Sequence, residues 1–67
     1  MIMYKVTKTD IFTRECYRVS GKSVYYSFKD LASGEIRCRR ELIRHTRHIW
    51  VKSEEEAKLL LRQKFIR

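Results

Sequence analysis

The chain has 67 residues, and its 16 Lys and Arg against 8 Asp and Glu give a formal net charge of +8. A chain of this length forms one small domain, residues 1–67, whose interior leaves little room for a catalytic pocket, so we expect neither an enzyme nor a small-molecule substrate. The basic excess favours a polyanionic partner such as nucleic acid.

Signals for membranes and secretion are absent from the sequence. No run approaches the roughly 20 apolar residues that cross a bilayer, and the start MIMYKV lacks the pattern of a signal peptide. Two cysteines are too few for a disulfide-stapled secreted scaffold, so free thiols are predicted. We therefore expect a cytoplasmic protein that does not contact membranes.

The first strand is predicted over residues 2–7. Ile2, Tyr4 and Val6 alternate with their neighbours at the period of two that is typical of a half-buried strand. The chain from residue 10 to 13 is predicted to be a connection.

A hairpin is predicted from residues 14–19 and 22–29. Ser20 and Gly21 supply a turn between two runs of strand-forming residues. In the second arm Tyr26 is expected on the core face, as are its neighbours Val24 and Phe28, and Tyr25 on the opposite face.

A third arm is predicted over residues 35–40. Asp30 and Gly34 bound a loop whose residue types suit a hairpin connection. Alternation in this arm predicts two sets of side chains. Ile36 and Cys38 are expected to point into the core, and Arg37 and Arg39 outward beside Tyr25.

The last part of the chain is predicted to be a short strand and a helix. Ile49 and Val51 share one face of the strand, and Trp50 lies on the other, as a core aromatic. Ser53 and Glu56 form a capping box for a helix that runs to the end of the chain. The expected apolar stripe of this helix is Ala57, Leu60, Leu61 and Phe65. We expect the stripe to cover the sheet face of Val24, Tyr26, Phe28, Ile36 and Cys38.

These elements predict an α+β fold, an antiparallel sheet of three to five strands backed by one C-terminal helix. The basic side chains gather in one part of it. Residues 36–52 carry six basic side chains and one acidic side chain, a net of +5. Residues 1–35 carry six basic and four acidic side chains, a net of +2, and residues 53–67 carry four basic and three acidic side chains, a net of +1. The uncovered sheet face is therefore expected to be basic.

Such a face suits nucleic acid. Guanidinium groups make bidentate hydrogen bonds to phosphate or to the edge of guanine. Hydroxyl groups can donate hydrogen bonds to phosphate oxygens. We expect a nucleic-acid-binding module, with duplex DNA as the partner and RNA as an alternative. The candidate contacts are Arg14, Arg18, Tyr25, Arg37, Arg39, Arg40, Arg44 and Arg47. The simpler interpretation of the same pattern is that this sheet face is exposed to solvent and that its arginines only keep the protein soluble.

Two segments carry a resemblance to known families. YYSFKDLASGE is similar to the aromatic strand and turn of the N-terminal arm-binding domains of phage and transposon tyrosine recombinases, and IWVKSEEEAKLLLRQ resembles the strand and capped helix that follow there. Plant ethylene-response-factor domains share this plan. The resemblance implies a three-stranded sheet that lays its open face in the major groove. By position it implies DNA contacts by Arg14, Arg18, Tyr25, Arg37 and Arg39.

The extra first strand leaves an alternative fold open. Five short strands and a C-terminal helix also describe the SH3-like small barrel of archaeal chromatin proteins. In that arrangement Trp50 is a candidate for insertion into DNA rather than a core residue.

The sequence leaves two further possibilities, a metal site and a second kind of partner. Cys16, Cys38, His45 and His48 lack the short Cys-x-x-Cys spacing of zinc sites, so no metal and no cofactor is expected. The rival function is a small phage or mobile-element factor that docks on an acidic surface of a host protein, because Tyr, Trp and Arg are also favoured at protein interfaces.

Overall fold

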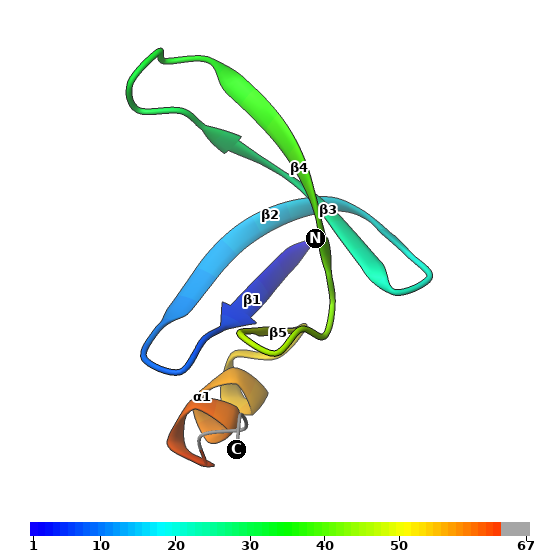
Figure 1. Cartoon of the computed structure of the whole chain (residues 1–67), viewed down its shortest axis with the longest axis vertical. Helices are drawn as coiled ribbons and strands as arrows, with labels where there is room; N and C mark the ends of the chain where they lie inside the picture. The colour runs from blue at the N-terminus through cyan, green and yellow to red at the C-terminus, as the bar shows by residue number, and fades with distance from the viewer. Residues whose placement is uncertain (64–67) are drawn as a thin grey trace.

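The computed structural model describes residues 1–63, which form a five-stranded antiparallel sheet followed by one helix (Figure 1). The sheet has the strand order β4-β3-β2-β1-β5. The predicted small α+β fold is confirmed, and the sheet is not closed into the alternative barrel. The elements are β1 (Ile2–Val6), β2 (Ile11–Ser20), β3 (Ser23–Lys29), β4 (Ile36–Leu42), β5 (Ile49–Val51) and α1 (Glu54–Gln63).

Strand β2 joins the two halves of the sheet. Its first half pairs with β1, its second half pairs with β3, and the register shifts between Cys16 and Arg18. The predicted connection over residues 10–13 is wrong, because β2 begins at Ile11. The turn before it is shorter than expected, since the Thr7 hydroxyl accepts a bond from the Asp10 amide and closes the chain tightly.

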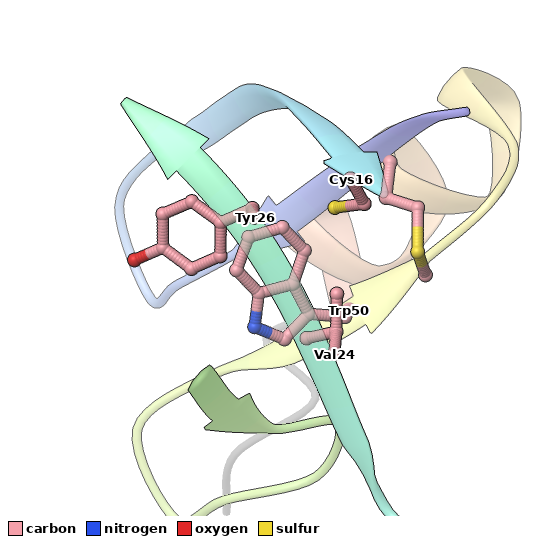
Figure 2. Close-up of a cluster of buried hydrophobic side chains, with 5 residues drawn as sticks. Cys16, Val24, Tyr26 and Trp50 are labelled. Atoms are coloured by element: carbon pink, nitrogen blue, oxygen red, sulfur yellow. The ribbon is translucent and has the colours of Figure 1, made fainter. Parts of the chain in front are cut away.

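The sheet curls around one of its faces. Tyr26 on β3 and Trp50 on β5 are separated by two strands, a span of about 14 Å in a flat sheet. Their ring centroids are nevertheless only 5.2 Å apart, and Figure 2 shows the two rings side by side. We call this concave face the inner face and its opposite the outer face. The buried inner cluster is Met3, Cys16, Val24, Tyr26 and Trp50.

Helix α1 lies on the outer face of the other half of the sheet. Ala57 is fully buried against Val6 and Val51. The predicted cap is present in part, because the Ser53 hydroxyl accepts a bond from the Glu56 amide. No helix within residues 1–63 is long and apolar enough to cross a bilayer.

The predicted docking site of the helix is wrong. We expected its stripe to cover the face of Val24 and Tyr26, but curling closes that face with Trp50 from β5. Leu60 and Leu61 instead pack on the buried residues Val6, Val51 and Ala57, which we call the helix cluster. The predicted stripe residue Phe65 and the end of the predicted helix lie outside the described residues.

Strand β1 therefore serves two clusters. Val6 is buried as expected, against the helix and with Tyr4 beside it, but Met3 on the opposite side is buried in the inner cluster. Ile2, expected with the buried set, is 45% exposed. Because both faces of β1 are covered, its residues do not alternate between buried and solvent-exposed, as they would in a half-buried strand.

The register of β3 with β4 overturns the predicted facing of the third arm. The loop between them runs from residue 30 to 35, where the Asp30 amide donates to the Glu35 carbonyl. Tyr26 is thereby paired with Arg39, and Ser27 with Cys38. A shift of one residue moves every side chain of a strand to the other face. Cys38 and Ile36 are accordingly exposed rather than in the core.

Candidate nucleic-acid interface

Aromatic and arginine side chains meet on the outer face of β2, β3 and β4. Tyr25 in the middle strand is paired with Arg18 on one side and with Arg40 on the other. The Arg18 guanidinium lies 5.3 Å from the centre of the Tyr25 ring, and the Tyr17 and Tyr25 rings are 6.3 Å apart. We call Tyr17, Arg18, Tyr25 and Arg40 the outer patch.

An irregularity in β2 makes this patch possible. Consecutive residues of a regular strand point to opposite faces, yet Tyr17 and Arg18 both contact Tyr25. The register shift between Cys16 and Arg18 is the local cause, because a bulge re-aims the side chains beside it. Alternation alone therefore did not reveal Tyr17 as a member of the patch.

The outer patch is open to solvent and carries hydrogen-bond donors. Tyr17 is 59% exposed, and Arg18 and Arg40 are exposed. Desolvation by neighbouring groups raises the pKa of the Tyr17 hydroxyl, and the adjacent Cys38 thiol adds to the rise. The Tyr17 hydroxyl, like any phenol, can donate a hydrogen bond to an anionic oxygen.

Two of the predicted contact residues lie on the other face. Arg37 and Arg39 share the side of Phe28 and Tyr26, not that of Tyr25. The Arg37 Nε atom is 2.9 Å from a carboxylate oxygen of Asp30, so its charge is compensated. Arg39 stacks over Phe28, with its guanidinium 5.0 Å from the ring centre. The expectation that these arginines lie beside Tyr25 is wrong.

The remaining predicted contacts are spread around the sheet. Arg14 is half-buried opposite Met3 and stacks over Phe12 at 5.6 Å. Arg44 and Arg47 are exposed in the segment between β4 and β5. The structure thus brings Arg18, Tyr25 and Arg40 together and separates the other five.

Each acidic side chain of residues 14–47 forms an ion pair with a positively charged group. Residues 14–47 contain nine Lys and Arg and four Asp and Glu, a net of +5. Glu15 pairs with the N-terminal amine, Asp30 and Glu35 pair with Arg37, and Glu41 pairs with Lys5. The basic excess near the outer patch is therefore left uncompensated by the acidic residues of this segment.

Glu41 is a polar centre that the sequence pattern did not reveal. Its carboxylate accepts bonds from Tyr26 Oη at 2.7 Å and Trp50 Nε1 at 3.3 Å, and it lies 2.9 Å from Lys5 Nζ. Burial opposes the charged form, but the bonds from Lys5 and Tyr26 outweigh it and lower the pKa of Glu41. Burial, together with the bond to Glu41, raises the pKa of Tyr26. The available sequence signal was a lone acid within the basic run.

The residues considered for zinc are not brought together. Cys16 is buried in the inner cluster, and Cys38 is exposed. His45 and His48 stack at 5.2 Å, and the His48 ring bonds the Leu42 carbonyl at 2.8 Å. Within residues 1–63, no group of three or more His, Cys, Asp or Glu side chains is placed to hold a metal ion.

Comparisons with protein-family models, with curated proteins and with solved structures found no match to this chain. The resemblance to recombinase and ethylene-response-factor domains stays a prediction.

Proposed function

We propose that this protein is a nucleic-acid-binding module that contacts duplex DNA through the outer patch. The observation that carries the proposal is the row of Arg18, Tyr25 and Arg40 across three neighbouring strands, in a region with a net charge of +5. Two exposed guanidinium groups on either side of a tyrosine can bind phosphate or the edge of guanine.

The dimensions of the sheet suit the major groove. Three antiparallel strands span about 10 Å from the first strand axis to the third, and the major groove is about 12 Å wide. The outer face is convex, because the sheet curls the other way around the inner cluster. Arg44 and Arg47 lie beyond the end of β4, where they would contact the phosphate backbone.

The test is salt-dependent binding of a fluorescent 20-base-pair duplex by the double variant Arg18→Ala, Arg40→Ala. Each phosphate contact contributes about 0.9 to the slope of log K against log salt, so the double variant should reduce the slope by roughly two. We expect its affinity at low salt to fall by at least about tenfold. Fluorescence anisotropy over a salt series measures both quantities.

Arg37→Ala is the control for the choice of face. It removes one arginine, against two in the double variant, from the opposite face of the same sheet and from a pair with Asp30. We expect its salt slope to stay close to that of the wild type. An unchanged slope in the double variant, or an equal loss in Arg37→Ala, would refute the proposed face.

Single-stranded DNA and RNA of the same length complete the series. Bases of a single strand can stack on exposed aromatic rings. A preference for single strands that is lost in Tyr17→Leu would assign the outer patch to base stacking and would contradict the duplex proposal. Indifference to every nucleic acid and to heparin would favour the rival protein-docking function.

A further inference from the structure

Strand β4 forms an open edge of the sheet. It pairs with β3 and with no other strand of residues 1–63, and in Figure 1 the β3–β4 hairpin extends away from the helix. Its seven residues are all exposed except Glu41. An exposed edge carries backbone groups that can pair with another extended chain.

The backbone bonds identify which groups of β4 point outward. A backbone hydrogen bond is present at each end of the β3–β4 ladder: the Asp30 amide donates to the Glu35 carbonyl, and the Ile43 amide donates to the Lys22 carbonyl. In an antiparallel ladder every second pair of opposed residues is hydrogen-bonded. Since residues 35 and 43 are bonded, the odd-numbered residues of β4 direct their backbone groups toward β3. The outward residues are Ile36, Cys38, Arg40 and Leu42.

One observation supports this assignment independently. The Leu42 carbonyl, which should point outward, accepts a bond from the His48 ring at 2.8 Å. Side-chain capping therefore ends the open edge at Leu42. Within the described part of the chain, the outward groups of Ile36, Cys38 and Arg40 have no such cap.

The side chains along this edge define the chemistry of a partner. On the outer face Ile36 is 69% exposed, and Leu42 on the same face is 49% exposed. On the inner-face side Arg37 and Arg39 are exposed, and Arg37 is already paired with Asp30 and Glu35. A complementary strand would place apolar residues against Ile36 and Cys38 and an acidic residue against Arg39.

A second copy of the chain is a poor occupant. Each copy carries the same basic excess, a net of +5 over residues 14–47, so two such edges repel each other. Charge complementarity instead favours an acidic segment.

We propose that β4 is a docking edge for an extended acidic segment of another protein, which adds to the sheet along residues 36–40 as a sixth strand. Backbone bonds to Ile36, Cys38 and Arg40 hold the segment, and an acidic side chain opposite Arg39 sets its register. This edge is distinct from the row of side chains proposed to contact DNA, although Arg40 belongs to both.

The direct test is amide hydrogen exchange with the peptide Val-Glu-Val-Glu-Val-Glu-Val. Amides of Ile36, Cys38 and Arg40 exchange with solvent in the free protein and should slow by roughly tenfold when the peptide is present at ten times its Kd. Amides of Arg37 and Arg39 are already bonded to β3 and should exchange slowly in the free protein, so that only the outward amides pass from rapid to slow exchange. This alternation along one strand is specific to strand addition.

Two control peptides separate strand addition from simple charge attraction. A version N-methylated at alternate residues keeps its charge but loses backbone donors, and a version with Lys in place of Glu reverses the charge. Neither should slow exchange at the outward amides. Equal protection by the N-methylated peptide, or none by the parent peptide at about 1 mM, overturns the proposal.

Variants of β4 complete the test. Cys38→Pro removes an outward amide that β3 does not use, so the hairpin should persist while peptide affinity falls at least about tenfold. Retained protection of the Arg37 and Arg39 amides reports that β4 still folds. Cys38→Ser and Arg18→Ala should bind the peptide normally. Wild-type affinity in a folded Cys38→Pro would refute the docking edge.

Discussion

Glu41 receives bonds from residues at opposite ends of the curled sheet. Lys5 belongs to β1, Tyr26 to β3 and Trp50 to β5, and all three contact its carboxylate. Glu41 itself lies on β4, with 14% of its side chain exposed. A half-buried carboxylate with three donors ties together strands that are not neighbours in the sheet, and so holds the curl.

We expect Glu41→Gln to destabilise the domain by about 2 kcal/mol, because it removes charge-assisted bonds and leaves Lys5 without its carboxylate partner. Urea unfolding at neutral pH measures the loss. Glu15→Gln is the control, since Glu15 is 64% exposed in its pair with the N-terminal amine and such pairs contribute under about 1 kcal/mol. Equal stability of the two variants would contradict the role given to Glu41.

The same carboxylate predicts a dependence on pH. The pKa of Glu41 in the folded protein is below its ordinary value of 4.5, so the folded state favours the charged form. Its contribution is fully present above pH 4.5 and is lost as the pH falls through the folded pKa. Unfolding free energies measured downward from pH 6 should fall more steeply in the wild type than in Glu41→Gln. Parallel curves would count against the assignment.

In the β3–β4 hairpin, β3 faces as predicted, whereas the register reverses the predicted facing of β4. Pairing of Ser27 with Cys38 puts the thiol on the outer face, whereas Cys16 on β2 pairs with Tyr26 on the inner face. The two cysteines therefore lie in different environments despite being in the same sheet. Burial raises the pKa of the Cys16 thiol.

This difference predicts one reactive thiol in the native protein. Cys38 is exposed and should react readily with a disulfide reagent such as Ellman's, whereas Cys16 is 1% exposed and should react only after unfolding. Counting thiols in buffer and in denaturant should give one and then two. Cys38→Ser should abolish the native reaction, and a native reaction that persists in it would show that the facing is wrong.

At the scale of the whole molecule, two apolar clusters share strand β1. Met3 enters the inner cluster with Trp50, and Val6 enters the helix cluster with Ala57. The clusters lie on opposite faces of the sheet, yet both depend on β1 and β5. We therefore expect the helix and the curled sheet to unfold together.

Val6→Ala tests this coupling. Val6 is fully buried, so the lost methyl groups and the cavity should cost about 2 kcal/mol. Trp50 fluorescence and helical circular dichroism should give the same urea midpoint, lowered equally. Leu59→Ala, at a helix position that is 47% exposed, should change the midpoint little. A helix signal lost at lower urea than the Trp50 signal would show two independent units.

Several features could be predicted from the sequence because they depend on neighbouring residues. Alternation correctly separated Tyr25 from Tyr26, and turn chemistry located Gly21 and Gly34, which have φ angles of 57° and 75°. Ser53 marked the start of the helix, and Trp50 was assigned to the core. Each of these depends on chain-local geometry or on a strong hydrophobic preference.

Long-range packing decided the rest. A loop one residue longer than expected put Arg37 on the inner-face side, because register depends on how the loop closes. Curling brought Trp50 to Tyr26 and left the helix to cover the other face of β1. By itself, the sequence determined that strands are present, that turns lie at Gly21 and Gly34, that a helix follows Ser53 and that the chain is basic. Only the tertiary structure decided which arginines stand together, since pairing and curvature join residues that are distant along the chain.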